Sequence, residues 1–284
     1  MTFSKHSLFG FVFFILLCIG LIAPFTFLPV KVTAEAEQNF TVQKSIKKIV
    51  KIAEKPLHNV NLPDFANIYD VKEKKRQFFE FIRPAVIAEN NNILILRTEI
   101  ERLIGQMTLE QPLDIKEQAF VADLVKQYKV SKRFSLLRQL YELQLKVDII
   151  PPELIMVQAA NESAWGTSRF ARIGLNFFGV WCYQKGCGMV PNRRNEGAKH
   201  EVAAYSSVEQ GVSRYIKNIN TNSAYIVFRT IRGQLREQNQ PLAPEILATG
   251  LIPYSERGAD YVLEITAMIR HNQPYLYPNI YKPL

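Results

Sequence analysis

An uncharged segment near the amino terminus sets the strongest limit on how this chain folds. Residues 8–30 contain no Asp, Glu, Lys, Arg or His. As a helix rising about 1.5 Å per residue, they are long enough to cross a hydrocarbon core of about 30 Å. We therefore predict an export segment over residues 1–34, with the remainder of the chain outside the cytoplasm.

The flanks of this segment leave its fate open. Ala34 and Ala36 supply small residues at which a signal peptide can be cut. The apolar run is, however, longer than the usual signal core of about 7–15 residues. An uncleaved anchor in the inner membrane is therefore an equal alternative. Both outcomes predict a periplasmic protein, exported or anchored by residues 8–30.

Together with the predicted export, the net charge limits the kinds of molecule that this protein is expected to bind. The 284 residues carry a formal net charge of +9, which can attract nucleic acid, an anionic membrane face or an acidic polymer. An exported protein rarely meets nucleic acid, so we exclude nucleic acid as a partner and favour the cell wall. A basic surface that only aids solubility explains the charge equally well.

The residues after the export segment are predicted to form a stalk and then a helical extension. Residues 35–63 lack a long apolar repeat and contain a basic stretch, which is typical of a linker. From 64 to 145 the apolar residues recur at helical spacing. This pattern predicts two long helices between 65 and 109, followed by a second helix pair. The second pair is based on two apolar stripes: Phe120, Val121, Leu124, Val125 and Tyr128, then Phe134, Leu137, Leu140 and Tyr141.

The remaining residues, 146–284, are predicted to be mainly α-helical. Pro151 and Pro152 break the chain and suit the first turn of a helix from 153 to about 170. Residues 179–205 contain Gly, Pro and a short alternation of apolar residues, which predicts loops and a small β-hairpin. Ser206 and Glu209 have the spacing of a capping box that opens the next helix. Two further helices are predicted near 225–238 and 258–271.

Two cysteines lie close together within the predicted hairpin. Cys182 and Cys187 are five residues apart, and an oxidising compartment allows them to form a disulfide, which we favour over free thiols. A zinc site normally needs four ligands, and only His200 lies near in sequence. We therefore predict no metal.

Glu162 is the residue whose surroundings best suit catalysis. It follows an apolar stretch and precedes Trp165 by three residues. A carboxyl group beside an aromatic wall loses hydration of its charged form, so its pKa rises and it keeps a proton near neutrality. A glycosidic leaving oxygen requires such a proton donor. The alternative is a helix-end carboxylate that pairs with Arg169 or Arg172.

Four ordered motifs resemble the glucosaminidase family, and within it the Bax-like group. Together they span about residues 147–272, and their order and gaps make the resemblance much stronger than any single motif does. The motifs are Gln158-Ala-Ala-Asn-Glu162-Ser-Ala-Trp-Gly166, Asn176-Phe-Phe-Gly179-Val, Ala204-Tyr205-Ser206-Ser and Tyr254-Ser-Glu-Arg-Gly258-Ala-Asp-Tyr261.

The resemblance implies a fold and an activity. The expected fold is mainly α, a lysozyme-like catalytic domain at 146–284 with a small β-hairpin lobe beside a cleft, preceded by the helical extension. The expected enzyme is an endo-β-N-acetylglucosaminidase that hydrolyses the β-1,4 bond after N-acetylglucosamine in peptidoglycan glycan strands. Glu162 is its expected general acid, and no cofactor is needed.

The group that assists Glu162 is left open. Glu196 and Glu201 lie in the segment that matches the family's β lobe, and we prefer Glu201 because the alternation around it suggests a fixed direction. A substrate's own acetamido group can replace a protein nucleophile. Tyr254 matches a family tyrosine that can orient that acetamido group or steady positive charge. Glu201 as an exposed strand charge and Tyr254 as a packing aromatic are the alternatives.

Further residues are predicted to bind the glycan. Asn176, Phe178 and Gly179 resemble the family's loop beside the sugar site, where glycine permits close approach of the backbone. The other predicted contacts come from the aromatic and acidic residues of the motifs and their flanks: Trp165, Trp181, Tyr205 and Glu256.

Two rival functions remain. A lytic transglycosylase also uses one helical glutamate but forms an anhydro sugar end without adding water. A non-catalytic wall-binding protein is suggested by Ser255-Glu256-Arg257, which departs from the family's usual sequence after the tyrosine.

Overall fold

The computed structural model describes residues 54–192, 197 and 199–277. The predicted export segment, most of the predicted linker and Glu196 lie outside these residues, so the predictions made for them stay predictions. Among the described residues, no helix has both the length and the apolar character needed to cross a membrane.

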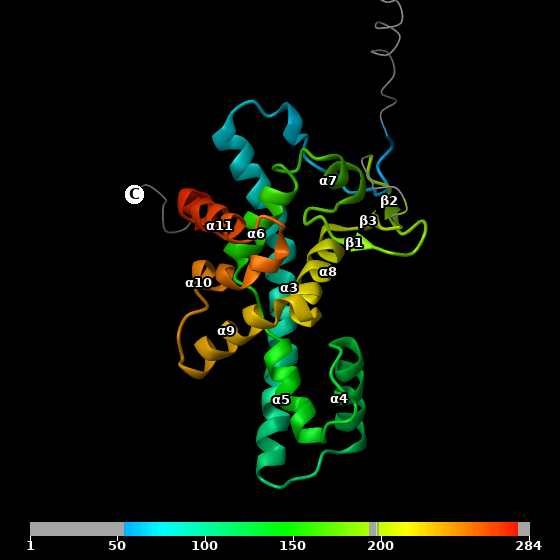
Figure 1. Ribbon diagram of the computed structural model, residues 1–284, viewed down its shortest axis with the longest axis vertical. Coiled ribbons are helices and arrows are strands. Elements are labelled where there is room, and N and C mark those ends of the chain that lie inside the picture. The colour runs from blue at the N-terminus through cyan, green and yellow to red at the C-terminus, as the bar shows by residue number, and fades with distance from the viewer. Residues whose placement is uncertain (1–53, 193–196, 198, 278–284) are drawn as a thin grey trace, which may run out of the picture. The chain divides into compact units, whose positions relative to one another are not determined.

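Residues Lys55–Leu284 form one compact unit, and its described part is mainly helical, as predicted. In Figure 1, α9, α10 and α11 lie to one side of the long helix α3, and the small sheet lies to the other. The helical elements are η2 (Phe65–Asn67), α3 (Val71–Thr108), α4 (Ile115–Gln127), α5 (Leu136–Lys146), α6 (Pro152–Glu162), α7 (Arg169–Gly174), α8 (Val208–Thr221), η3 (Ser223–Tyr225), α9 (Ile226–Glu237), α10 (Pro244–Ala248), η4 (Thr249–Tyr254), α11 (Ala259–His271) and α12 (Gln273–Leu276).

Helix α3 corrects the prediction of two helices between 65 and 109. It is continuous over 38 residues and contains Pro84. A proline inside a helix removes one backbone hydrogen bond, but Phe79, Ile82 and Val86 on either side are fully buried. Their packing keeps the helix intact, because burial of each such side chain contributes about 1.5–3 kcal/mol.

The extension and the predicted catalytic region share one hydrophobic core. Helix α3 packs against α5, α6 and α8, so residues on both sides of the boundary predicted at 145/146 bury one another. The predicted pair α4 and α5 is present. Two residues of its predicted stripes, Phe134 and Tyr141, are nevertheless exposed. The guanidinium group of Arg138 lies 5.6 Å from the centre of the Phe134 ring.

A buried ion cluster ties these helices together. The side chain of Asp148 is 2% exposed and accepts hydrogen bonds from Arg236 at 3.0 and 2.8 Å. Arg97 of α3 and Arg232 of α9 approach it at 3.4 and 3.8 Å. Burial opposes ionisation of Asp148, but the three guanidinium groups outweigh it and hold its pKa below the ordinary value.

The sheet differs from the predicted hairpin. Three short strands, β1 (Trp181–Cys182), β2 (Gly188–Met189) and β3 (Glu201–Ala203), pair antiparallel in the order β1-β3-β2. The third strand in sequence therefore lies in the middle. Gly188 permits this arrangement, because a Cβ at that position would lie 2.0 Å from the carbonyl oxygen of Val202.

Two helix ends differ from their predicted positions. Helix α6 begins at Pro152, one residue before the predicted start, and stops at Glu162 instead of continuing to about 170. The cap of α8 is shifted by one residue, since Ser207 accepts from the backbone N–H of Gln210 and the side chain of Gln210 accepts from that of Ser206. The apolar residues at helical spacing in α8 are all buried: Val208, Val212, Tyr215, Ile216 and Ile219.

Candidate active site

Glu162 is the last residue of α6, and the turn that follows it is tightly fixed. Ala164, Trp165 and Gly166 all have positive φ angles, from 49° to 77°. Ser163 stabilises this turn, since its hydroxyl donates to the carbonyl oxygen of Ala159 at 2.6 Å and accepts from the N–H of Gly166 at 2.8 Å. The carboxyl group is thereby held at a rigid helix end.

The surroundings of Glu162 favour its protonated form. Its side chain is partly buried, and this burial raises the pKa of Glu162 above the ordinary value. The negative charge of Glu264 raises the pKa of Glu162 further. Hydrogen bonds from Tyr261 and Asn161 lower it, as does the positive charge of Arg257, but they do not cancel the desolvation. Arg257 and Glu264 pair with each other at 2.6 Å.

A buried hydrogen-bond chain leads to Glu162. Tyr215 donates its hydroxyl proton to Oε1 of Gln158, and Nε2 of Gln158 donates to the hydroxyl oxygen of Tyr261 at 2.8 Å. Because that oxygen already accepts from Gln158, the hydroxyl proton of Tyr261 is available to Glu162. Tyr215 and Gln158 are fully buried. The chain therefore fixes the direction in which Tyr261 donates.

Four tyrosines from four elements surround this carboxyl group. Burial raises the pKa of Tyr215, Tyr225, Tyr254 and Tyr261, and the negative charge of Glu162 raises each pKa further. The rings of Tyr254 and Tyr261 stack at 5.4 Å. Tyr254 donates its hydroxyl proton to the carbonyl oxygen of Phe178 at 2.9 Å, so this proton is already engaged.

An open groove of about 650 Å³ elsewhere, between α3, α5 and α9, contains the ion cluster of Asp148. A second groove, of about 610 Å³, lies beside Glu162. Asn161, which hydrogen-bonds to Glu162, and Glu264, whose charge acts on it, both line this second groove. We call it the α3–α11 groove. Its lining residues are Lys75, Ala160, Asn161, Ala164, Trp165, Glu264, Ala267, Met268, His271 and Asn272.

Trp165 lines the groove, but it also packs on the extension. Its ring meets the edges of Phe78 and Phe79 at 5.7 and 5.4 Å, and the ammonium group of Lys75 lies 5.3 Å from its centroid. The aromatic groups whose pKa the charge of Glu162 raises are the four tyrosines described above. Trp165 lines the groove, and its role as a substrate contact stays a prediction.

The predicted sugar-binding loop is held by internal hydrogen bonds. The side chain of Asn176 is buried, donates to the carbonyl oxygens of Val180 and Ala203, and accepts from the backbone N–H groups of Phe178 and Val180. Phe178 is buried and stacks on Tyr215 at 4.2 Å. Asn176 and Phe178 are therefore buried residues that stabilise the conformation of the loop. Gly179 has a φ of 64°, which suits glycine at this turn.

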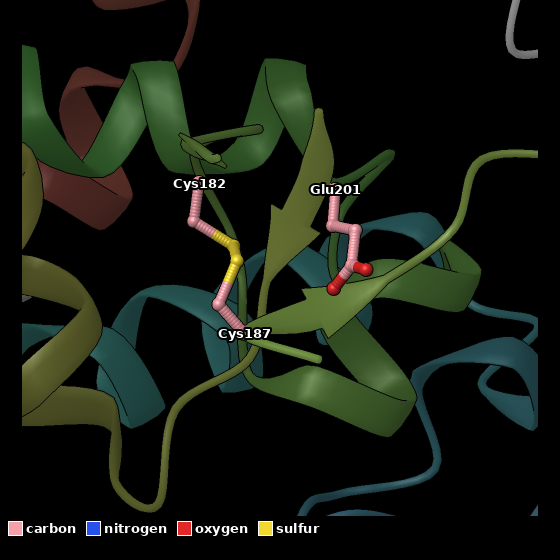
Figure 2. A group of neighbouring side chains, drawn as sticks. All are labelled: Cys182, Cys187 and Glu201. Atoms are coloured by element: carbon pink, nitrogen blue, oxygen red, sulfur yellow. A yellow bond between two sulfur atoms is a disulfide. The ribbon is translucent and has the colours of Figure 1, made fainter. Parts of the chain in front are cut away.

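Glu201 is buried on β3 beside the disulfide between Cys182 and Cys187 (Figure 2). Its two carboxylate oxygens accept from the backbone N–H groups of Gly186 and Gly188 at 3.0 and 2.9 Å. Cys182, Cys187 and Glu201 have potential metal-ligand atoms within 4.8 Å of one another. Both sulfur atoms are in the disulfide, however, so neither is a thiolate that can bind a metal.

The other predicted contacts have different environments. Trp181 is 54% exposed and stacks on His200 at 4.1 Å, which leaves an aromatic face at the surface. Tyr205 is buried, with its ring against Gly211. Glu256 is exposed. The roles assigned to these residues stay predictions.

Comparison with known proteins identifies the family. Protein bax of Escherichia coli strain K12 is 32% identical over 216 residues, which cover 75% of this chain and 75% of that protein. The glucosaminidase family, described as mannosyl-glycoprotein endo-β-N-acetylglucosaminidase, matches residues 138–274. The chain belongs to the glucosaminidase family. No solved structure matches the chain significantly.

The similarity to protein bax reaches beyond the glucosaminidase match. The 216 aligned residues exceed the 137 residues from 138 to 274, and only ten residues follow 274. Most of the additional similarity therefore precedes residue 138, where α3 lies. This agrees with the shared core of α3, α5, α6 and α8.

Sequence reasoning missed three polar residues of the candidate site. Gln158, Asn161 and Tyr261 all lie within the motifs that indicated the family, but no role was assigned to them. The available signal was Gln158, a polar residue in an otherwise apolar stretch. A buried amide of this kind requires hydrogen-bond partners, although the sequence does not show that Tyr215 and Tyr261 supply them.

Proposed function

We propose that this glucosaminidase hydrolyses the β-1,4 bond after N-acetylglucosamine in peptidoglycan, with Glu162 as the general acid. One observation carries the proposal: Glu162 is a partly buried carboxyl group with a raised pKa at a rigid helix end, and its neighbour Asn161 lines an open groove. A proton donor beside space for a polymer is what glycoside hydrolysis requires.

In this proposal the surrounding groups act at different stages. Protonated Glu162 gives its proton to the bridging oxygen as the glycosidic bond breaks. The carboxylate that remains then accepts hydrogen bonds from Tyr261 and Asn161, which stabilise its negative charge. Water completes the hydrolysis and returns a proton to Glu162.

The assisting group is proposed among three candidates. Both carboxylate oxygens of Glu201 accept hydrogen bonds from backbone N–H groups, which favours a role in stabilising the β lobe. Glu196 lies outside the described residues. The substrate's acetamido group needs no protein carboxylate, and Tyr254, in the tyrosine cluster, is our candidate to orient it.

Peptidoglycan is proposed as the glycan for three reasons. The family implies a glycan substrate, and the uncharged residues 8–30 predict export to the compartment that contains the cell wall. The net charge of +9 also suits an acidic polymer.

The test compares the full-length chain with Glu162→Gln on purified peptidoglycan. We expect a loss of about 10²–10⁴-fold in the rate of glycan release, because general acid catalysis contributes about that factor. Glu209→Gln, an exposed position in the first turn of α8, makes the same chemical change away from the groove and should keep full activity. Equal release by wild type and Glu162→Gln would remove the catalytic role of Glu162.

Mass spectrometry of the products separates the rival reactions. Hydrolysis as proposed leaves reducing N-acetylglucosamine ends. Anhydromuramic ends would instead identify a lytic transglycosylase and overturn the hydrolase proposal.

A further inference from the structure

One wall of the α3–α11 groove comes from outside the residues that match the family. Lys75 belongs to α3, whereas residues 138–274 carry the family match. Opposite α3, the groove is lined by Met268, His271 and Asn272 at the end of α11. The extension therefore contributes a cationic side chain to a groove beside Glu162.

Asn272 lines this groove and has a hydrogen-bond acceptor that no described residue uses. The residue is 2% exposed, and its Nδ2 donates to the carbonyl oxygen of Met268 at 2.7 Å. Only the NH₂ group can donate to a carbonyl, so this bond fixes the orientation of the amide. Its Oδ1 atom is buried and has no hydrogen-bond partner among the described residues. An unsatisfied buried acceptor of this kind costs about 1–3 kcal/mol, so a hydrogen-bond donor at this end of α11 would be stabilising.

Lys75 offers an unneutralised positive charge to the same groove. Its ammonium group lies over the ring of Trp165 at 5.3 Å and makes no ion pair with a described residue. Glu264, the acidic residue of the groove, is already paired with Arg257. A carboxylate on a ligand therefore meets an available cation at the α3 side.

The remaining lining suits a flexible chain with both polar and apolar parts. The indole of Trp165 and the thioether of Met268 give apolar contact. His271 uses Nδ1 to donate to the carbonyl oxygen of Ala267 at 2.7 Å, which leaves Nε2 as a second acceptor when the ring is neutral. Acceptors for N–H groups, a cation for a carboxylate and apolar surface together match an acidic peptide better than an uncharged sugar.

We propose that the α3–α11 groove binds the acidic peptide attached to the glycan, with Lys75 as the residue that recognises a peptide carboxylate. This inference rests on the proposed function, because it assigns a part of the peptidoglycan substrate to a groove beside Glu162. The amino-terminal extension then acts as a specificity element of the glucosaminidase.

The test measures binding without requiring turnover. Glu162→Gln protein, as the full-length chain, is titrated by calorimetry with a soluble disaccharide that carries an acidic peptide, and with the same disaccharide lacking the peptide. We expect the peptide to strengthen binding about three- to tenfold, the range for one partly exposed charge-assisted contact. Equal affinity for the two ligands overturns the proposal.

Matched variants locate the effect. In the Glu162→Gln background, Lys75→Met should abolish most of the preference for the peptide-bearing ligand, whereas Lys75→Arg should retain it. Lys116→Met, on the exposed surface of α4, makes the same change of net charge and should leave the preference intact. If Lys75→Met keeps the full preference, the assignment of Lys75 is wrong.

The two proposals can fail separately. Loss of the proposed function would appear as glycan release that does not depend on Glu162. Loss of this inference would appear as equal binding of the two ligands, whatever the outcome for Glu162.

Discussion

Replacing Tyr261 by Phe tests the hydrogen-bond chain that leads to Glu162. Phe keeps the aromatic ring that stacks on Tyr254 and removes only the hydroxyl group. Two interactions are lost: the bond that Gln158 donates to this hydroxyl at 2.8 Å and the bond that the hydroxyl donates to Glu162. The variant therefore perturbs both stability and the ionisation of the proposed acid.

The loss of stability follows from the burial of Gln158. Its side chain is 0% exposed, so its Nε2 group loses a partner that water cannot readily replace. Such an unsatisfied donor costs about 1–3 kcal/mol. For a compact unit of this size, each kcal/mol lowers the melting temperature by about 2–4 °C. The melting temperature of Tyr261→Phe should therefore be about 2–12 °C lower than that of the wild type.

The effect on catalysis has a definite sign. The hydroxyl of Tyr261 stabilises the ionised carboxylate, so it lowers the pKa of Glu162. Without it, the pKa of Glu162 rises further and the protonated acid persists to higher pH. The alkaline limb of kcat/KM should then move to higher pH.

The assay is a pH profile of kcat/KM on peptidoglycan for wild type, Tyr261→Phe and Tyr254→Phe. Tyr254 donates its proton to the carbonyl oxygen of Phe178, so its variant serves as the matched control and should keep the wild-type alkaline limb. An unchanged limb in Tyr261→Phe, or one displaced to lower pH, would refute the assignment of Tyr261 as the donor to Glu162.

Two further predictions concern charge. Asp148→Asn should destabilise the fold by about 3–5 kcal/mol in thermal or denaturant unfolding, because it leaves the buried guanidinium of Arg232 without its counter-ion; a change below about 1 kcal/mol would contradict this role. Since the pKa of Asp148 is lowered, the stability it contributes should also fade as the pH drops through that lowered value. Arg257→Gln should shift the alkaline limb of kcat/KM to higher pH and Glu264→Gln should shift it to lower pH, because their charges respectively lower and raise the pKa of Glu162; shifts in the same direction would refute this electrostatic account.

Local sequence patterns predicted the helical elements well where one face is buried. The inner face of α8 and the start of α6 at Pro152 follow from periodicity and from the conformation that proline prefers. The same reasoning failed between 65 and 109, where two helices were predicted and α3 is instead one continuous helix, because the aromatic and aliphatic side chains around Pro84 are buried. It also placed the end of α6 too late, since a turn of three positive φ angles is not visible in apolar spacing.

By itself, the sequence determined the identity of the proposed acid, the mainly α fold and the family, because these depend on residue types, on spacings within one element and on the order of motifs along the chain. Tertiary structure alone decided the environment of that acid. Gln158 and Tyr261 are 103 residues apart in the chain, and Lys75 reaches Trp165 from a helix outside the matched domain. Periodicity shows which face of a helix is buried but not which distant side chains it contacts. These contacts between distant residues determine the direction in which the pKa of Glu162 shifts and the residues that line the groove beside it.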